Sequence, residues 1–309
     1  MSDIEKTAER NAVMWMLFGA ICISFAPVFV KLIGEHRLGP TAIGFWRVLF
    51  GAAVLFILAI ARGGRPLLSG KLWRFAVQAG FIFFLDLFVW HRSIVYSGAG
   101  MATILGNTQV FATGLLSFLI FSDRLSVRYF VAAGTGIIGV FLLVGVMSEE
   151  VAFTSRYLHG IAFGLATGLV YANFLITLKW ASNRVGIPDV VTFMAWTSLF
   201  SAVFLGTSAV IEGGPLVPPD TQTWLCLIGV GLVAQAFGWW AITSSLAKIV
   251  ASRAGLILLL QPTLAMVWGV IMFSEQFTHW QLVGAVITLG AIYYGGLRNS
   301  RPRPTPTPQ

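Results

Sequence analysis

Charged residues are scarce in this chain. Only 10% of its 309 residues are charged and 57% are hydrophobic, and the mean hydropathy is +0.83. A soluble domain has about 25% charged residues, because it must cover its surface with polar groups. The shortage excludes an ordinary water-soluble protein. The apolar runs are continuous rather than alternating, which favours membrane helices over a membrane β-barrel and predicts an all-α integral membrane protein.

Cysteine and catalytic motifs are also lacking. Cys22 and Cys226 lie in separate apolar runs, which gives neither a metal motif nor a disulfide framework. The chain has no phosphate-binding loop, no HExxH motif and no GxSxG motif, so ATP-driven pumping by this chain alone is disfavoured. We expect no cofactor, no metal site and no catalytic residue. No cleavable signal peptide is evident, so the first apolar run is predicted to stay in the membrane.

Long apolar runs are what the sequence does contain. A hydrocarbon core of about 30 Å needs about 20 helical residues, and ten runs approach or exceed that length, with short polar connections between them. The predicted spans are 12–33, 41–61, 72–95, 98–120, 127–147, 158–179, 188–211, 222–246, 253–273 and 279–297.

Lysine and arginine are distributed unevenly over the connections between these spans. Most fall on one side, together with both ends of the chain. The rule that positive residues stay inside therefore predicts that both termini are cytoplasmic. The opposite side is poor in cations and rich in acids, and is predicted to hold Lys31, Glu35, Arg37, Arg92, Glu149, Glu150, Arg156, Glu212, Asp220 and Glu275.

Two stretches of the chain are related to each other. When the stretch that ends in Asp123 is aligned with the one that ends in Glu275, Gln109 falls on Gln261. A duplicated membrane protein with five spans in each half has its halves inverted, and secondary transporters with this plan bind solutes where the halves meet. We predict a cytoplasmic segment 1–11, a first repeat 12–150, an inverted second repeat 151–297 and a disordered cytoplasmic tail 298–309.

This plan resembles the drug/metabolite transporter superfamily, in its EamA-like family. The residues that carry the likeness are Phe45-Trp46-Arg47, Tyr96-Ser97-Gly98-Ala99, Leu258-Leu259-Leu260-Gln261-Pro262, Phe121-Ser122-Asp123-Arg124-Leu125-Ser126 and Phe273-Ser274-Glu275-Gln276-Phe277-Thr278. The family commonly has proline where this chain has Asn107-Thr108-Gln109-Val110, and glutamate where it has Asp123. The third span, rich in aromatic residues and containing a histidine, is most similar to amino-acid exporters of the YddG type. The resemblance implies efflux of amino acids, including aromatic ones, through a cavity between the halves.

Polar side chains within the spans are the candidate site residues, because burying them in a membrane is costly. Arg47 could bind a substrate carboxylate, or pair with Asp86 or helix carbonyls, or reach the outer face. Asp86 could couple transport to protons, or form a buried ion pair, or bond a neighbouring helix as a protonated acid. His91 could donate to a carboxylate or lie at the membrane interface. The predicted substrate-binding set is Arg47, His91, Asn107, Gln109, Tyr171, Gln235, Trp239 and Gln261.

These observations predict an exporter of the bacterial inner membrane that moves small metabolites, most of all amino acids, by alternating access. The polar mid-span residues would hold the polar groups of the solute, and aromatic residues would contact its side chain. An exporter of drugs, sugars or nucleotide-linked compounds is the alternative within the same fold. An enzyme is disfavoured, because Asp86 and His91 lie about 140° apart around one helix. We expect a monomer or weak homodimer without nucleic acid.

Overall fold

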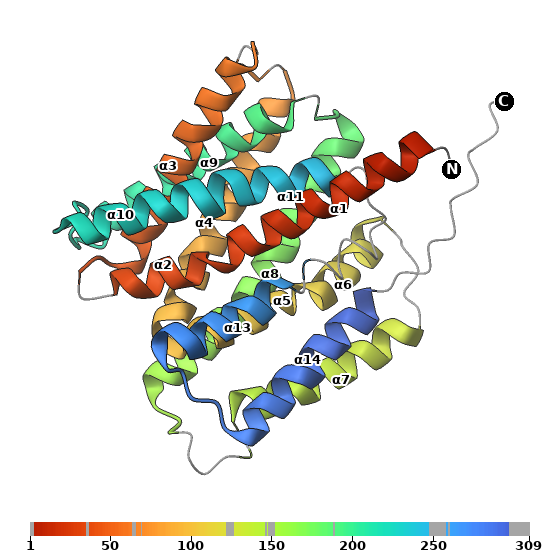
Figure 1. Ribbon diagram of the computed structural model, residues 1–309, viewed down its shortest axis with the longest axis vertical. Helices are drawn as coiled ribbons and strands as arrows, with labels where there is room; N and C mark the ends of the chain where they lie inside the picture. Colours follow the sequence, from red (N-terminus) through yellow and green to blue (C-terminus); the bar gives the residue numbers. More distant parts are fainter. Residues whose placement is uncertain are drawn as a thin grey trace.

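The computed structural model describes residues 3–34, 37–63, 66–68, 70–121, 127–145, 147, 152–187, 189–246, 258 and 260–296. All regular elements within these ranges are helices (Figure 1). In chain order they are α1 (Asp3–Ser24), α2 (Ala26–Ile33), α3 (Pro40–Ala61), α4 (Leu72–Ser97), α5 (Ala99–Asn107), α6 (Gln109–Phe121), α7 (Val127–Val144), α8 (Ser155–Arg184), α9 (Val190–Ile211), α10 (Thr221–Gly229), the π-helix η1 (Val230–Gly238), α11 (Trp239–Leu246), α13 (Leu260–Phe273) and α14 (His279–Gly296).

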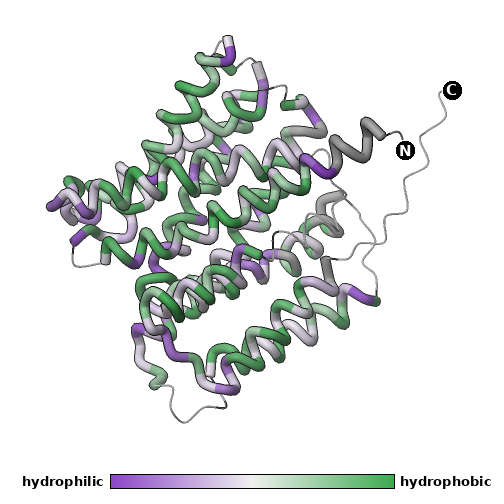
Figure 2. Tube along the Cα trace, in the orientation of Figure 1, coloured by the Kyte–Doolittle hydropathy of each residue, from purple (hydrophilic) through white to green (hydrophobic). Residues whose placement is uncertain are grey.

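Seven segments of the described chain are long and apolar enough to cross a membrane. They are Arg10–Ile33, Pro40–Ala61, Leu72–Ser97, Val127–Val144, Ser155–Leu178, Val190–Ile211 and Thr221–Ser245. The other predicted spans, 98–120, 253–273 and 279–297, overlap α5 with α6, α13, and α14. Large apolar side chains such as Ile57, Ile211 and Val286 are exposed, and hydrophobic residues run along the whole length of the helices (Figure 2). These properties make the chain a multi-pass membrane protein.

The helices pack mainly in pairs that join the first part of the chain to the second. α3 lies along α9, α4 along α8, and α7 along α14, while α1 packs against η1 and α11, and α5 against α13 (Figure 1). Small residues allow some of these close approaches: in α8, Gly160 lies against Ser97 and Gly164 against Leu105. Three ion pairs, Lys31–Glu275, Arg37–Asp220 and Arg92–Glu212, join residues that the charge pattern assigned to the same side of the membrane.

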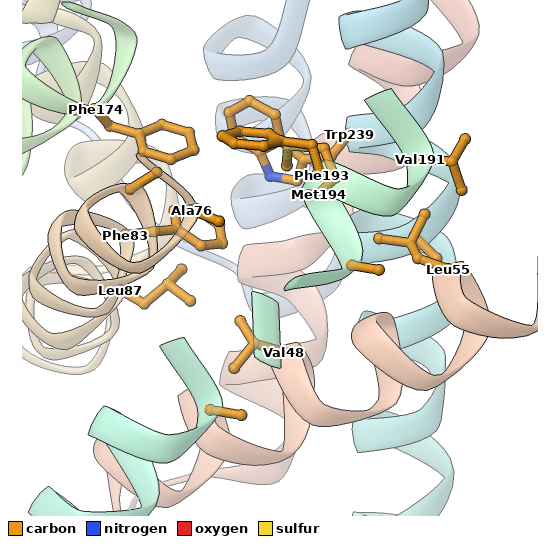
Figure 3. Packing of buried hydrophobic residues seen from close by; sticks show 14 of the residues in the cluster. Val48, Leu55, Ala76, Phe83, Leu87, Phe174, Val191, Phe193, Met194 and Trp239 are labelled. Atoms are coloured by element: carbon orange, nitrogen blue, oxygen red, sulfur yellow. The ribbon is translucent and has the colours of Figure 1, made fainter. Parts of the chain in front are cut away.

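The largest hydrophobic cluster joins α3, α4, α8, α9 and α11 (Figure 3). At its centre the ring of Phe83 stacks on that of Phe174, with centroids 4.9 Å apart, and Trp239 meets both rings edge-on at 5.8 Å. Such pairs contribute about 0.5–1.5 kcal/mol beyond their burial. The cluster therefore fixes the position of the Trp239 indole relative to α4 and α8.

Three helices in the described part of the chain are interrupted along their length. α1 gives way to α2 at Phe25, where Pro27 cannot donate the next backbone hydrogen bond. α5 gives way to α6 at Thr108, whose hydroxyl donates to the carbonyl of Leu105 at 2.6 Å, while the Asn107 amide donates to the carbonyl of Thr103 at 2.8 Å. These side-chain bonds compete with the helical pattern and end α5 without a proline. The third interruption is η1, between α10 and α11.

Candidate functional site

A cavity lies among the interrupted helices. Its volume is about 60 Å³, which accommodates a few water molecules. Elements from both parts of the chain line it: α1 to α5 on one side, and α8, α11 and α13 on the other. Of the predicted site residues, the structure brings together Arg47, Asp86, Asn107, Tyr171, Trp239 and Gln261 in this lining. We call this space the central cavity.

Arg47 is the cation of the central cavity. It lies on α3 and is 2% exposed. Its Nε donates to Oε1 of Gln235 at 3.3 Å, and Nε2 of Gln235 donates to Oγ of Ser198 at 3.0 Å. The guanidinium also lies over the ring of Trp90, 5.2 Å from its centroid. Gln235 does not line the cavity itself, but its hydrogen bond to Nε orients the guanidinium of Arg47.

Gly51 makes this arrangement possible. A side chain at position 51 would overlap the Cβ and Cγ atoms of Gln235. Gly51 lies one helical turn after Arg47 on α3, so the Gln235 side chain can pass over it and reach the guanidinium. The predicted set contained Gln235, but only the structure gives it this supporting position.

Asp86 is the carboxylic acid of the central cavity. It lies on α4 and is 8% exposed. Its Oδ1 has no hydrogen-bond partner among the described residues, and the same is true of Nη1 of Arg47. In the described part of the chain the two side chains form no ion pair with each other or with any other residue. The cavity thus contains a basic and an acidic side chain, both buried and each with an atom that has no partner among the described residues.

Aromatic rings form the apolar wall of the cavity. Phe83, Trp90, Tyr171 and Trp239 all line it, and Tyr171 meets Trp239 edge-on with centroids 6.0 Å apart. The Nε1 atom of Trp239 is buried without a partner among the described residues. This wall is suited to an apolar or ring-bearing group.

His91 and Gln109 lie outside this lining. The ring of His91 is fully buried on α4 and contacts Gly44, and neither of its nitrogens has a partner within the described ranges. The side-chain oxygen of Gln109, on α6, accepts a hydrogen bond from the hydroxyl of Thr113 at 2.8 Å. Its predicted counterpart Gln261 does line the cavity, and its amide has no partner among described side chains or backbone groups.

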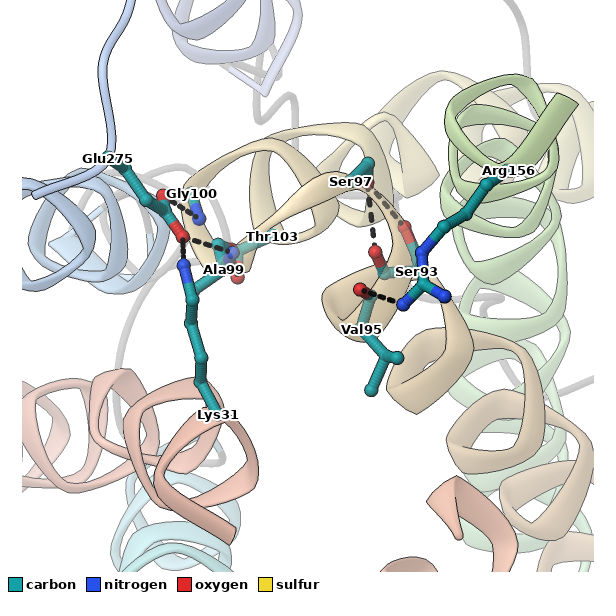
Figure 4. A network of polar contacts seen from close by, with 9 residues as sticks. All are labelled: Lys31, Ser93, Val95, Ser97, Ala99, Gly100, Thr103, Arg156 and Glu275. Atoms are coloured by element: carbon teal, nitrogen blue, oxygen red, sulfur yellow. Dashed lines mark hydrogen bonds and ion pairs between the residues drawn. The ribbon is translucent and has the colours of Figure 1, made fainter. Parts of the chain in front are cut away.

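A second polar cluster lies at the helix ends around Glu275 (Figure 4). The Glu275 carboxylate accepts from Nζ of Lys31 at 2.5 Å and from the backbone nitrogen of Ala99 at 2.9 Å, and Gly100 donates at 3.5 Å. Gly98, at a φ of 94°, turns the chain so that α5 begins directly beneath the carboxylate. Because Glu275 follows α13 and Ala99 begins α5, these two helices run in opposite directions.

Comparison with known proteins gives the family. The model of the EamA-like transporter family matches residues 10–145 and again 158–294. The chain belongs to the EamA-like transporter family. It is accordingly a multi-pass membrane transport protein, and the central cavity is its candidate site.

The relatives of this EamA-like transporter include two proteins described as probable amino-acid metabolite efflux pumps. The one from Salmonella typhimurium is 26% identical, covering 84% of this chain and 87% of the relative. The one from Escherichia coli is 25% identical, covering 86% and 89%. An uncharacterized transporter of Archaeoglobus fulgidus is 25% identical, covering 90% and 93%. A protein crystal structure shares the fold, with a TM-score of 0.65 and 17% identity over 92% of this chain and 96% of the other.

Sequence reasoning missed the hydroxyl groups that line the cavity of this EamA-like transporter. Ser24, Thr103 and Thr167 each donate to a carbonyl of their own helix, at 2.7, 2.8 and 2.9 Å. Hydroxyls bonded in this way are common in membrane helices, so no signal in the sequence separated these from other Ser and Thr residues. Trp90 was not in the predicted set, and the structure shows that it lines the cavity and contacts Arg47.

Proposed function

We propose that this transporter exports amino acids, including aromatic ones, across the bacterial inner membrane. The observation that carries the proposal is the central cavity, where a buried cation and a buried anion lie beside an aromatic wall. The names of the Salmonella and Escherichia relatives support amino-acid metabolites as the solute class. A single arginine in the lining disfavours phosphate-bearing solutes, which need more positive charge.

The transport mechanism that we propose is alternating access by two inverted repeats of five spans, 12–150 and 151–297, with both termini cytoplasmic. Three findings support it: the family model matches twice along the chain, helices pair across the two parts, and α5 runs opposite to α13. The interrupted helices lie at the cavity, where a site between repeats is expected. Most solutes are larger than the present cavity, so the halves must separate to admit them.

Counterflow in proteoliposomes tests the function. The purified transporter is reconstituted in liposomes loaded with one unlabelled amino acid, and entry of the same labelled amino acid is followed for the common amino acids in turn. We expect transient accumulation for a subset that includes L-leucine or L-phenylalanine. If no amino acid accumulates and a sugar or a cationic drug shows counterflow instead, amino-acid export is wrong and the alternative solute class is supported.

Two glutamines provide matched variants for this assay. Gln261 lines the cavity without a partner among the described residues, whereas Gln281 on α14 is similarly buried and its Oε1 accepts from the backbone nitrogen of Thr278 at 3.0 Å. Gln261→Leu should lower counterflow while leaving the melting temperature nearly unchanged. Gln281→Leu should lower the melting temperature while leaving the apparent affinity for the amino acid unchanged. Equal loss of affinity in both variants would contradict a site in the central cavity.

A further inference from the structure

Arg47 and Asp86 are two buried charges in one cavity that do not neutralise each other. Each has an atom without a partner among the described residues, and the two side chains form no ion pair. Leaving a charge buried and unpaired is costly. A fold that used them for stability alone would bring them into contact, so the missing ion pair leaves both side chains available to a solute that enters the cavity.

The surroundings of the two charges differ in a way that suits two different groups. Arg47 is oriented by Gln235 through Nε, and Nη1 of its planar guanidinium has no partner among the described residues, so this edge can donate to a carboxylate. Asp86 has Oδ1 unpaired and accepts no hydrogen bond from a described residue, so it can accept one from a cation. Tyr171 and Trp239 continue the lining with apolar surface.

We infer that Asp86 binds the α-ammonium group and Arg47 the α-carboxylate of a zwitterionic α-amino acid, whose side chain lies against the Trp239 wall. The inference rests on the proposed function and deepens it by assigning the two halves of the zwitterion. One carbon atom joins the ammonium and carboxylate groups of an α-amino acid, so a single solute can satisfy both charges. The solute class is therefore free amino acids rather than N-acylated, deaminated or decarboxylated relatives.

This assignment makes Asp86 a specificity-determining residue. A solute without the ammonium group leaves Asp86 unpaired, and a solute without the carboxylate leaves Arg47 unpaired. Sites built for a polar group discriminate strongly against an analogue that lacks it, because their own buried groups then remain unsatisfied. The two charges should thus act separately, each on its own part of the solute.

The test measures inhibition of counterflow by paired analogues. The labelled probe is L-phenylalanine, with 3-phenylpropanoate and 2-phenylethylamine as the analogues that lack the ammonium or the carboxylate. If the counterflow screen finds only aliphatic solutes, L-leucine, 4-methylpentanoate and 3-methylbutylamine replace them. In the unmodified transporter we expect each analogue to inhibit about tenfold or more weakly than the amino acid itself.

The variants Asp86→Asn and Arg47→Gln test which side chain binds which group of the solute. Asp86→Asn should weaken inhibition by the amino acid about tenfold or more and leave inhibition by the deaminated acid unchanged or improved. Arg47→Gln should weaken inhibition by the amino acid but not inhibition by the decarboxylated amine. Counterflow is an exchange at equal pH on both sides, so loss of a proton-coupling group alone would leave these inhibition constants unchanged.

Two results would overturn the inference while leaving the proposed function intact. One is an Asp86→Asn transporter that loses affinity for the amino acid and the deaminated acid equally. The other is an Asp86→Asn transporter that keeps its affinity for both, which would favour proton coupling. Absence of amino-acid counterflow in the unmodified protein would instead remove the proposed function itself.

Thermal unfolding without solute separates binding from a structural role. Removing one partner of a buried ion pair destabilises a protein strongly, because the other charge is left uncompensated. Asp86 has no such partner within the described structure, so Asp86→Asn should unfold at the same or a higher temperature than the unmodified transporter. If it unfolds at a lower temperature, Asp86→Glu, which keeps the charge, must restore both the temperature and the discrimination for the inference to stand.

Discussion

The carboxylate of Glu275 lies 2.5 Å from the ammonium nitrogen of Lys31, although 244 residues separate them in the chain. The same carboxylate accepts hydrogen bonds from the first two backbone N–H groups of α5. A negative charge at a helix N-terminus is favourable because the free N–H groups point toward it. Glu275 therefore holds the ends of α2, α5 and α13 together at one end of the transporter.

The two partners of this cluster should differ in their effect on stability. Glu275→Ala removes the ion pair and leaves two backbone donors unpaired, so it should cost about 1–3 kcal/mol. Lys31→Met removes the ion pair of a partly exposed lysine and its contact with the Phe273 ring, 4.8 Å from Nζ, and should cost about 1 kcal/mol. Thermal unfolding in detergent measures both. Equal destabilisation by the two variants would show that the backbone bonds to Glu275 contribute nothing.

Gly51→Ala should disturb the site without touching the cavity surface. The new methyl group would overlap Gln235, so the glutamine must move and its bond to Nε of Arg47 must break. We expect a destabilisation of about 1–3 kcal/mol and a lower apparent affinity for the transported amino acid.

The matched control for this change is Gly134→Ala on α7. A side-chain carbon at Gly134 meets no atom of the described structure within 4 Å. Because alanine is a better helix former than glycine, Gly134→Ala should leave affinity unchanged and stability equal or slightly higher. The apparent affinity in counterflow and the melting temperature are measured for Gly51→Ala and Gly134→Ala. A similar loss of affinity in both variants would contradict the role of Gly51.

Much of the cavity could be predicted from the cost of polar groups in a membrane, but the orientation of each side chain could not. Asp86 and His91 satisfy the same sequence criterion, and only Asp86 lines the cavity, because five residues correspond to about 140° of helical rotation. Gln109 was paired with Gln261 by alignment. The interruption at Thr108 separates Asn107, which lines the cavity, from Gln109, which bonds Thr113. No proline near Thr108 predicts this interruption from the sequence.

The predicted repeats depend partly on residues outside the described ranges. Asp123, where the first related stretch ends, lies there, as do residues 253–257 of the predicted span 253–273 and the predicted tail 298–309. The structure does describe the end of the second related stretch, where Glu275 accepts a hydrogen bond from the backbone nitrogen of Ala99. The opposite directions of α5 and α13 follow from this contact, which sequence alignment alone does not contain.

Asp220 provides a pH-dependent test at the start of α10. Its Oδ1 accepts from the backbone nitrogen of Thr223 at 2.8 Å. This bond, with further help from the Thr223 hydroxyl and Arg37, holds the pKa of Asp220 below its ordinary value. A depressed pKa means that the cap stabilises above the unfolded-state value of about 3.9 and is lost as the pH falls through the lower folded-state value.

Asp220→Ala should therefore lower the melting temperature at pH 7, and its difference from the unmodified transporter should shrink on acidification to about pH 3. Asp220→Asn keeps a good neutral cap and should lose less at pH 7. Melting curves of the three proteins at both pH values provide the measurement. A difference that grows on acidification would mean that the carboxylate does not stabilise α10 as its charged form.

Trp239 should set the size of the side chain that the cavity accepts. Its indole is 6% exposed and meets Phe83, Tyr171 and Phe174 edge-on. Trp239→Leu removes ring volume from the wall, so it should shift preference from smaller aliphatic toward larger aromatic amino acids by about tenfold. Its cost in stability should be less than the roughly 3–5 kcal/mol typical of Trp→Ala.

The control for Trp239 is Trp224→Leu on α10. Trp224 packs against Trp46, with centroids 4.9 Å apart, and does not line the central cavity. The Trp224→Leu variant should therefore lose stability but keep the ratio of affinities for L-leucine and L-phenylalanine. Because substitution of a packed tryptophan perturbs packing at either position, this ratio, measured by competition in counterflow, separates selectivity from folding. A ratio that shifts equally in both variants would place the side-chain subsite elsewhere than at the Trp239 wall.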